Sequence, residues 1–512
     1  MVVGGGITGL VAALRLSQGG SDVVIIEPGP WGGKLQTSLV AGRPVDETAD
    51  AFLLRVPWAL ALCHDLDIDG ELISPAERSA HVFVDGVRHR FPSGHVLGVP
   101  TDLNALARSG LISPAGVERA RAELSLGVQA TDPGVDGPDV PIGPYLRGRL
   151  GDEVVDHLID PLVGGINAGD TATLSLAAVV PQLDAAARSG DPSLVRSCAG
   201  LLAIPTASPD RRTEADPRGT PAGPPAQRHD RMETSPPAEP IFATPMGGMA
   251  RMVDAVLALI PGVERRIGTV VAVEPIGSRS AGSSPSVATG RGPGAGDRAR
   301  VVLADGAVID TDAVVLATPG HVAGSLLSSV SPEAASILAA LDHASISMVT
   351  IAFDRADLGD VTGASGCLIP RDQGTLVTAV SYATSKWAQL RNTARDDVIL
   401  RASAGRSGDD RHLDLDDAAL TERVLADLDR VVGVRGAPTE VRVGRWPRSF
   451  PQYAPGHLDR IDALEAALAD TPLRLAGMAL RGVGIPACIR SAELAAASLG
   501  ATWPTRRNHT SP

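Results

Sequence analysis

The chain is poor in lysine, in aromatic residues and in cysteine. Lys34 and Lys386 are the only lysines among its 46 basic residues, and aromatic residues make up 3% of its 512 positions. Leucine, valine, isoleucine and alanine must therefore build the core, for which a hydrophobic content of 44% is ample. The near-complete use of arginine in place of lysine indicates a GC-rich genome rather than a function.

The four cysteines lie far apart and form no Cys-x-x-Cys pair: Cys63, Cys198, Cys367 and Cys488. Eleven histidines are also scattered, without a His-Glu-x-x-His motif. This spacing argues against a metal site or a disulfide framework and favours a reducing compartment. No run of about 18 apolar residues predicts a transmembrane helix. The N-terminus does not resemble a signal peptide, so we expect a cytoplasmic protein.

A deficit of basic charge limits the possible partners. The net charge is −13 and the isoelectric point is about 5.3. Nucleic-acid binding needs a basic face to neutralise phosphates, so no nucleic-acid partner is expected. A chain of 512 residues is too long for one ordinary core, and we expect two or three domains.

The strongest motif is Gly4-Gly5-Gly6-Ile7-Thr8-Gly9, which has the form G-x-G-x-x-G. We expect a strand ending at Val3, a helix over residues 7–18 and a second buried strand over residues 22–27. In such a βαβ unit the glycines allow a tight turn, close approach of a pyrophosphate and close packing of the helix. The pyrophosphate lies at the helix N-terminus. Glu27 ends the second strand, where a carboxylate accepts the ribose hydroxyls.

The glycine motif alone carries little weight, because a glycine-rich turn followed by a surface glutamate has the same letters. The strand before it, the helix after it and the acid at the expected distance favour dinucleotide binding. Only three residues precede Gly4, whereas a strand usually has about five or six. Either the first strand is short or the true N-terminus lies upstream of Met1.

Two later segments bear on the choice between FAD and NAD. Gly32-Gly33-Lys34 follows the second strand, and residues 46–52 form an acidic segment with small residues. FAD is extended, and its ribityl chain and flavin need a second channel lined by backbone. Here the chain resembles the flavoprotein superfamily that includes amine oxidases, phytoene desaturases and protoporphyrinogen oxidases. The resemblance implies FAD as cofactor, with Lys34 and Thr48–Ala51 along the flavin channel.

Further motifs resemble the oxygen-dependent porphyrinogen oxidases, and among them the bacterial coproporphyrinogen III oxidase branch. This resemblance covers nearly the whole chain outside residues 205–240 and 277–299. The motifs at 451–457 and 482–486 are the most specific. The matching segments are 97–102, 151–154, 160–166, 168–170, 247–249, 385–387, 451–457 and 482–486.

The resemblance implies a set of binding residues. The predicted cofactor-binding residues are Gly4, Gly5, Gly6, Ile7, Thr8, Gly9, Glu27, Pro28, Lys34, Thr48, Ala49, Asp50, Ala51, Val270, Trp446, Val483, Gly484 and Ile485. The diphosphate should lie on the glycine motif, the ribose at Glu27 and the adenine at Val270. Asn167 and Lys386 are predicted substrate contacts, and no catalytic residue is assigned. Ordinary core packing is the competing interpretation for Val270 and Trp446.

The chain departs from the family pattern at three places. Thr48 stands where glycine is usual, Asn167 stands where an aromatic residue is common, and residues 478–481 replace a Gly-Asn-aromatic-acidic stretch. A side chain at position 48 alters how closely the backbone approaches the flavin. These differences bear on catalytic competence rather than on the fold.

The whole pattern predicts an α/β protein with three parts. A Rossmann-like FAD-binding domain is discontinuous over residues 1–75, 241–330 and 446–512. A mixed α+β substrate-binding domain covers 76–104 and 331–445, and a helical domain covers 105–204. Residues 205–240 and 277–299, rich in proline, glycine or polar residues, are predicted to be disordered insertions. A hairpin is expected at Asp305-Gly306 and a closing helix from about Ser491.

The implied activity is oxygen-dependent oxidation of coproporphyrinogen III to coproporphyrin III, with release of hydrogen peroxide, in haem biosynthesis. The flavin takes hydrides from carbon, and the protein supplies orientation, apolar walls and access for dioxygen. Protoporphyrinogen IX oxidase, a flavin amine oxidase and a carotenoid desaturase are alternatives, as is a non-catalytic binder of the GDP-dissociation-inhibitor type. The scarcity of aromatic residues disfavours the aromatic cage of an amine oxidase.

Basic residues are needed to hold the propionates of a porphyrinogen. Arg78, Arg88, Lys386 and Arg371 are candidates, although a solvated surface base is the commoner role for each. Protoporphyrinogen is poorly soluble and is handled at membranes. The chain has no long apolar run and no polybasic patch beside an amphipathic helix, which favours coproporphyrinogen.

Overall fold

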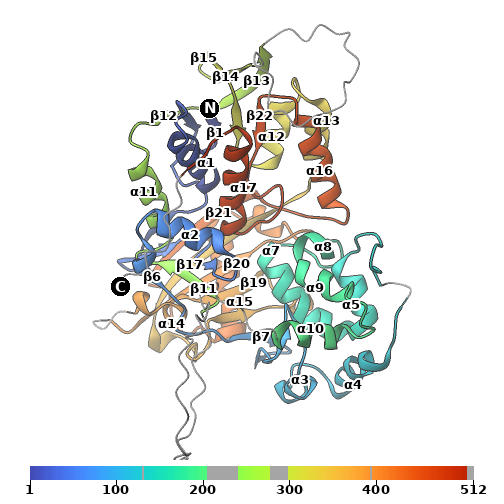
Figure 1. Ribbon diagram of the computed structural model, residues 1–512. Coiled ribbons are helices and arrows are strands. Elements are labelled where there is room, and N and C mark those ends of the chain that lie inside the picture. The colour runs from blue at the N-terminus through green and yellow to red at the C-terminus, as the bar shows by residue number, and fades with distance from the viewer. Residues whose placement is uncertain (130–131, 204–239, 277–297, 392–394, 504–512) are drawn as a thin grey trace, which may run out of the picture.

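The computed structural model describes residues 1–129, 132–203, 240–276, 298–391 and 395–503. An open sheet with flanking helices forms its upper part, a large sheet its lower part, and a cluster of helices lies beside the large sheet (Figure 1). Each sheet is built from segments that are distant in the sequence. The fold is therefore a mixed α/β fold. Within these ranges no helix is long and apolar enough to cross a membrane.

The upper sheet has five parallel strands in the order β12-β2-β1-β16-β22. The strands are β1 (Val2–Val3), β2 (Val24–Glu27), β12 (Glu264–Ile267), β16 (Val314–Leu316) and β22 (Leu473–Leu475). Helix α1 (Ile7–Gln18) follows β1, and α17 (Ile485–Ser498) packs against it. The last strand of the chain thus returns to the sheet that the first strand begins.

Burial on both faces explains why these strands are almost entirely apolar. Val2 and Ile25 belong to the core beneath α1 and α17, whereas their neighbours Val3 and Ile26 belong to a separate core on the opposite face. Successive side chains of a strand point to opposite faces, so each strand must supply apolar residues to both cores. The helices of the second core are α12 (Gly320–Leu327), α13 (Pro332–Ala339) and α16 (His457–Leu468).

The predicted start of the closing helix is wrong. Helix α17 begins at Ile485, six residues before Ser491, with Gly484 as its N-cap. Pro486 lies in the first turn, where its missing N–H costs nothing and its fixed φ suits the helix. The glycine-rich turn is therefore shorter than expected, and the helix N-terminus lies at the motif itself.

The hairpin at Asp305-Gly306 is confirmed, and it corrects one predicted boundary. Strand β14 (Arg298–Leu303) pairs with β15 (Val308–Thr311). Ala299, placed by the sequence prediction in a disordered insertion, is buried in this strand because it faces the core shared with the parallel sheet. The rest of that insertion and residues 204–239 lie outside the described residues.

The lower sheet has seven strands in the order β21-β17-β20-β19-β18-β7-β8. They are β7 (Ala80–Val84), β8 (Val87–Arg90), β17 (His343–Asp354), β18 (Gly366–Leu368), β19 (Val377–Tyr382), β20 (Asp397–Ala404) and β21 (Glu440–Pro451). All neighbours are antiparallel except β18 and β7. The predicted domain boundary at residue 446 falls inside β21.

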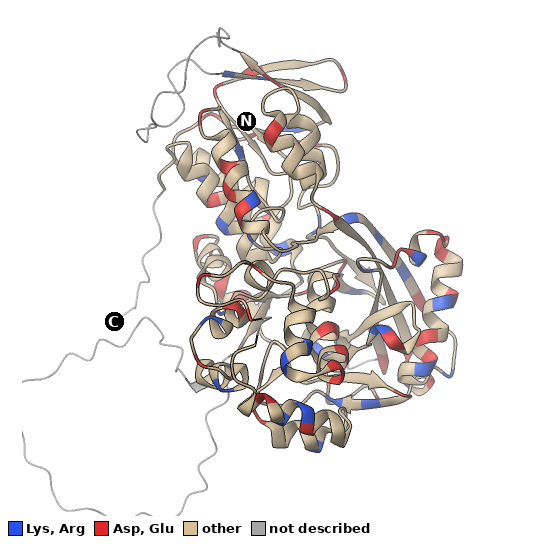
Figure 2. Cartoon of the chain, turned by 90° about the vertical axis from the view of Figure 1, so that its right-hand side faces the viewer, with Lys and Arg blue, Asp and Glu red and all other residues tan. Residues whose placement is uncertain are grey.

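The two faces of this sheet differ in what they contact. Val349 and Leu400 point toward α15 (Asp417–Val432) and form a core with it. Ile346 and Ser403, which have the opposite parity on their strands, line an open cavity. Lys and Arg residues, coloured blue, occur along strands of the sheet (Figure 2). One of them, Arg401, contacts Thr48 and Asp50 of the N-terminal segment.

Smaller elements connect the sheets. They are β3 (Thr37–Val40), β4 (Arg43–Asp46), β5 (Phe52–Leu53), β6 (Leu72–Ile73), β9 (His95–Val96), β10 (Val99–Pro100), β11 (Phe242–Pro245), β13 (Val270–Ile276), α2 (Pro57–Asp65), α11 (Ala250–Leu259) and α14 (Ala383–Lys386). β3 and β4 form a hairpin, and β11 lies between β5 and β6.

The helical part has its own apolar core. Its helices are α3 (Leu103–Ser109), α4 (Pro114–Ala122), α5 (Ile142–Leu150), α6 (Asp152–Val154), a π-helix (Val155–Gly164), α7 (Gly165–Asn167), α8 (Leu176–Val179), α9 (Pro181–Ala187) and α10 (Leu194–Ala203). The π-helix leads directly into the segment that reaches the cavity.

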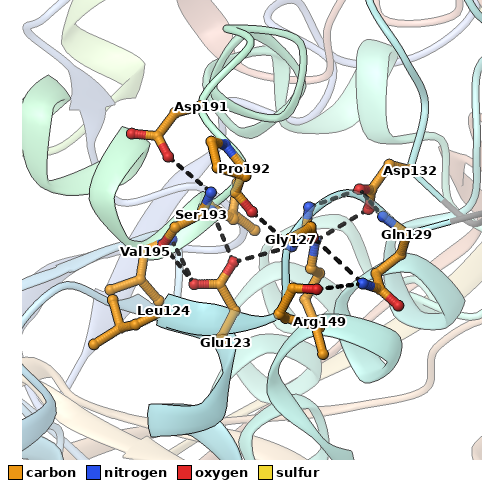
Figure 3. Close-up of polar contacts among 12 residues, drawn as sticks. Glu123, Leu124, Gly127, Gln129, Asp132, Arg149, Asp191, Pro192, Ser193 and Val195 are labelled. Atoms are coloured by element: carbon orange, nitrogen blue, oxygen red, sulfur yellow. Dashed lines mark hydrogen bonds and ion pairs between the residues drawn. The ribbon is translucent and has the colours of Figure 1, made fainter.

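A buried carboxylate joins three elements of this part (Figure 3). Glu123 has no exposed surface and accepts hydrogen bonds from the Ser193 hydroxyl at 2.7 Å and the Leu194 N–H at 2.7 Å. It thereby satisfies free N–H groups at the start of α10. Arg149 of α5 lies 3.5 Å from Glu123 and pairs with Asp132 at 2.6 Å. The charges of Glu123, Arg149 and Asp132 thus compensate one another.

Candidate cofactor and substrate site

The first glycine loop contains two positions that no other residue could occupy. A Cβ on Gly9 would lie 1.8 Å from the carbonyl oxygen of Gly4, and Gly4 itself has φ of +109° with the Ala317 oxygen 2.6 Å from its ideal Cβ. Gly6 is different, because a Cβ there would meet nothing closer than Gly32 at 4.0 Å. Space beside Gly6 is therefore left open, while Gly4 and Gly9 are required for the turn.

The second glycine loop lies against the first. The Gly32 N–H donates to the Gly5 carbonyl at 2.8 Å, and Gly33, with φ of +57°, places its ideal Cβ 3.2 Å from the Gly6 Cα. Two stretches of bare backbone therefore run side by side. This arrangement lets a ligand approach the main chain more closely than side chains would permit.

Helix α1 begins at this cradle with an uncapped N-terminus. Gly6 is the N-cap and supplies no side-chain hydrogen bond, while Ile7, Thr8 and Gly9 in the first turn are buried. Buried N–H groups at a helix N-terminus need partners, and the positive end of the helix dipole favours an anion. The cradle and the uncapped helix fit the diphosphate of FAD.

Glu27 lies at the end of β2 beside this loop. Its two carboxylate oxygens accept from the Gly5 N–H at 2.5 Å and from the Gly29 N–H at 2.9 Å. The Gly268 N–H donates to the Glu27 carbonyl at 3.0 Å, so the turn that leads to Val270 lies next to Glu27. Val270 is 8% exposed and is part of a core. The placement suits a ribose at Glu27, with the exposed Pro28 next to it.

The N-terminus of α17 forms a second uncapped helix end. Gly484 is the N-cap without a side-chain hydrogen bond, and Val483 and Gly484 remain accessible. The loop before it is held by Tyr453, whose hydroxyl donates to the Met478 carbonyl and accepts from the Gly482 N–H at 3.1 Å. The specific motif at 451–457 therefore positions the motif at 482–486.

The segment Thr48–Ala51 is fastened to the lower sheet by charge. Asp50 accepts from Lys386 at 2.9 Å and from the Trp387 indole at 3.1 Å, and it lies 3.2 Å from Arg401 of β20. Arg401 also donates to the Thr48 carbonyl. On the other side, the Thr48 hydroxyl donates to the Lys34 carbonyl. Thr48, which stands where glycine is usual, thus links two segments that are predicted to line the flavin channel.

Lys34 is nearly enclosed between these segments. Its Nζ lies 3.2 Å from the Met478 sulfur. Burial lowers the pKa of Lys34, and the nearby Cys488 thiol opposes that effect. Thioether sulfur is a weak acceptor, so the ammonium keeps hydrogen-bonding capacity for a ligand.

A cavity of about 520 Å³ opens between Thr48–Ala51 and the lower sheet. Ile346, Met348 and Ser403 form its wall on the sheet side, and Gly164–Ile166 border it from the helical part. A cavity of this size is typical of a small-molecule site. The segment predicted to line the flavin channel and a largely apolar wall therefore face the same space.

Comparison with known proteins identifies the family. A family model described as flavin containing amine oxidoreductase matches residues 7–499. The coproporphyrinogen III oxidase of Bacillus subtilis (strain 168) is 28% identical over 504 residues, covering 97% of this chain and 96% of its own. That of Propionibacterium freudenreichii subsp. freudenreichii is 32% identical over 520 residues, covering 98% and 92%.

The chain belongs to the flavin containing amine oxidoreductase family.

Solved structures agree with this assignment. A structure from Exiguobacterium sp. 255-15 has a TM-score of 0.77 at 27% identity and covers 97% of both chains. The cyclohexylamine oxidase of Brevibacterium oxydans IH-35A has a TM-score of 0.62 at 15% identity, which shows the shared fold. Family membership confirms that the chain is an FAD-dependent oxidoreductase, and the resemblance to porphyrinogen oxidases is confirmed by the full-length relatives.

The predicted substrate contacts of this family member separate into two groups. Arg78 and Lys386 line the cavity, as do Thr48, Ala49, Asp50 and Ala51. Asn167 is not among the residues that line it, because its amide donates to the Val163 carbonyl at 2.8 Å. Arg371 does not line the cavity but pairs at 3.0 Å with Asp160, which does, and Arg88 donates to the Asp360 carbonyl at the surface.

Trp446 lies on β21 opposite Ile346, which lines the cavity. Its indole N–H is buried and has no hydrogen-bond partner among the described residues. A buried donor of this kind favours a ligand nearby over ordinary core packing, which would satisfy or exclude it. Its role beside the flavin stays a prediction.

Sequence reasoning missed Arg401, Arg406 and the pair Tyr453 and His457 as site residues. Arg406 lines the cavity, and Arg401 holds Asp50. Tyr453 and His457 belong to the motif at 451–457, which is specific in the sequence. Their hydrogen-bond partners, however, lie about 25 residues further along the chain, from Met478 to Gly482. Only the fold brings these segments together.

We expect His457 to make stability depend on pH. The imidazole stacks on Tyr453 at 3.9 Å, and its Nε2 lies 2.6 Å from the Leu480 carbonyl. Burial lowers the pKa of His457 to about 4, and Arg460 and Arg481 act in the same direction, against the Leu480 hydrogen bond and Asp139. Below about pH 6.5 this histidine is protonated in the unfolded chain but remains neutral in the folded protein. The free energy of unfolding therefore decreases as the pH falls.

The expected loss is on the order of 3 kcal/mol between about pH 6.5 and pH 4. Urea unfolding at pH 7 and pH 5 would show a smaller pH effect for His457→Gln, whose amide still donates to Leu480. His64→Gln, at a half-exposed histidine, is the control and should retain the wild-type slope. If the free energy of unfolding changed equally between pH 7 and pH 5 in all three proteins, His457 would not be the cause of the pH dependence.

Proposed function

We propose that the protein oxidises coproporphyrinogen III to coproporphyrin III in the cytoplasm, with dioxygen as acceptor and hydrogen peroxide as product. The observation that carries this proposal is the cavity itself, which has the segment Thr48–Ala51 on one side and a largely apolar wall on the other, with both basic and acidic side chains in its lining. Relatives named coproporphyrinogen III oxidase align over the full chain and support the choice of substrate.

We further infer the domain organisation that this activity needs. The parallel sheet with the segments 1–75, 241–330 and most of 446–512 would form the FAD-binding domain, and the seven-stranded sheet with residues 76–104 and 331–445 the substrate-binding domain. The helical domain, 105–204, would close the cavity from the side through Gly164–Ile166. These boundaries are supported by the membership of the strands in the two sheets.

The residues of the chain bind and orient the reactants. The glycine cradle and the N-terminus of α1 would hold the diphosphate, Glu27 the ribose, and Lys34 with Val483–Ile485 the far end of the cofactor. When bound, FAD supplies the acceptor for hydride removal from the substrate and passes the electrons to dioxygen. The N–H groups of α17 favour negative charge at that end. The apolar wall excludes water from the reacting carbon.

Initial rates with two porphyrinogens test the proposal. We expect flavin-loaded protein to oxidise coproporphyrinogen III faster than protoporphyrinogen IX at equal, sub-saturating concentrations, followed by porphyrin fluorescence with peroxide measured in parallel. Peroxide should form in proportion to porphyrin. A preference for protoporphyrinogen IX, or turnover without peroxide, would contradict the assignment. A flavin-loaded protein inert toward both would favour an amine oxidase or a desaturase.

A further inference from the structure

Arg406 places a buried cation on the wall of the cavity. It follows Gly405 directly after β20, is 9% exposed and lines the cavity. Its Nε has no hydrogen-bond partner, and its guanidinium forms no ion pair with the described residues. A charge removed from water without a partner is strongly unfavourable. Its Nη atoms are not fully buried, so the guanidinium is open to an anionic group in the cavity and would be stabilised by one.

The nearby carboxylates are already in use. Asp160 is paired with Arg371 at 3.0 Å and also accepts from Thr171 at 2.8 Å. Asp409 accepts two hydrogen bonds from Arg411, each at 2.7 Å. Both acids raise the pKa of Arg406 from a distance, but neither contacts its guanidinium.

Arg406 is nonetheless charged at neutral pH. Burial and the repulsion of Arg371 lower its pKa to about 10, which leaves the guanidinium protonated. The planar fork of a guanidinium matches a carboxylate through two parallel hydrogen bonds. Lys386, which also lines the cavity, is by contrast already paired with Asp50.

We propose that Arg406 is the carboxylate-binding subsite of the cavity and holds one propionate of the tetrapyrrole. The inference rests on the proposed function and adds the residue that recognises the acidic side chain. Ser403 lies on the cavity wall between Arg406 and Arg401, which holds Asp50. Ala404 lies three residues beyond Arg401 along the strand, a distance of about 10 Å. The subsite thus lies further along the sheet than the segment predicted to face the flavin.

Binding of the product measures the subsite without turnover. We expect Arg406→Gln to weaken binding of coproporphyrin III about 10- to 100-fold, by loss of a charge-assisted bidentate contact. Porphyrin fluorescence at increasing protein concentration reports the dissociation constant. Arg355→Gln is the matched control, because it removes the same charge from an exposed pair with Asp396 outside the cavity, and it should bind like wild type. Arg406→Lys keeps the charge without the fork and should be intermediate.

The kinetic effect should appear mainly in KM for coproporphyrinogen III, with kcat changed only a few-fold. Melting temperatures of the porphyrin-free proteins then separate binding from a structural role. Removal of an unpaired buried cation should leave the melting temperature of Arg406→Met unchanged or raise it. A structural ion pair would make the same substitution destabilising.

Each outcome decides one question. Wild-type binding by Arg406→Gln, or a melting temperature of Arg406→Met that falls well below that of Arg355→Gln, would overturn the subsite while leaving the proposed function intact. A wild-type protein that neither binds coproporphyrin III nor oxidises its porphyrinogen would overturn the proposed function, and the subsite with it. Weakened binding confined to the Arg406 variants supports both.

Discussion

Substitution of Gly9 by alanine is expected to abolish FAD binding and to destabilise the protein. The new methyl group would lie 1.8 Å from the Gly4 carbonyl oxygen, and neither residue is free to move because Gly4 directly follows β1 and Gly9 lies in α1. Relief requires separation of the helix from the strand, which costs about 1–3 kcal/mol or more when a core is overfilled. Flavin absorbance after dialysis and the melting temperature of the apoprotein measure the two effects.

Two other glycines make the test specific. Gly6→Ala adds a methyl into open space, with nothing closer than 4.0 Å, at φ of −69° that alanine tolerates. We expect an apoprotein as stable as wild type that has lost most of its FAD affinity, because the methyl fills the space left for the diphosphate. Gly70→Ala, where no atom lies within 4 Å, is the control for both. Retention of FAD by Gly6→Ala would mean that the cradle is not the diphosphate site.

The parts of this fold encoded by neighbouring residues could be predicted from the sequence. The β1-α1-β2 unit depends on a glycine pattern and on apolar strands buried on both faces, and the structure places Ile7–Gln18 as the expected helix. The hairpin at Asp305-Gly306 was equally local. The start of α17 at Ile485 was missed because glycine and proline are normally read as breakers, although both are favoured at a helix N-terminus.

Residues of the site could be predicted from the sequence only where they belong to a recognisable motif. Thr48–Ala51 and Lys386 line the cavity, and their roles toward flavin and substrate stay predictions, whereas Asn167 lies beside the lining and Arg371 is paired with Asp160. No sequence feature distinguishes Arg406 from the many other arginines of this chain. Arg406 differs from them because the acids near it are already paired with other arginines, and only the three-dimensional structure shows that pairing.

The largest loss of stability at a single ionic group is expected at Asp50. The carboxylate is shared by Lys386 at 2.9 Å and Arg401 at 3.2 Å, whose side chains are 20% and 4% exposed. Asp50→Ala would leave two largely buried cations without a partner. Removing one member of a buried ion pair typically costs about 3–5 kcal/mol. Urea unfolding at pH 7 should show a loss of this size, with lower FAD retention because the segment predicted to line the flavin channel is released.

The pH dependence of unfolding and a double substitution test whether the loss of stability in Asp50→Ala is caused by charge. Burial alone would raise the pKa of Asp50, but Lys386 and Arg401 outweigh it and hold that pKa far below its usual range. The contribution of Asp50 is therefore complete above about pH 4 and is lost only as the pH falls from there toward the folded value. The difference between wild type and Asp50→Ala should be constant from pH 5 to pH 8.

The matched control is Asp396→Ala, which removes an exposed acid from its pair with Arg355 and should cost less than about 1 kcal/mol. Addition of Lys386→Met to Asp50→Ala should recover part of the lost stability, because one uncompensated cation is then removed with it. The loss at Asp50 would be steric rather than electrostatic if the second substitution made the protein less stable still. Recovery of stability without recovery of FAD retention would show that Lys386 and Arg401 hold the cofactor segment in place through this single carboxylate.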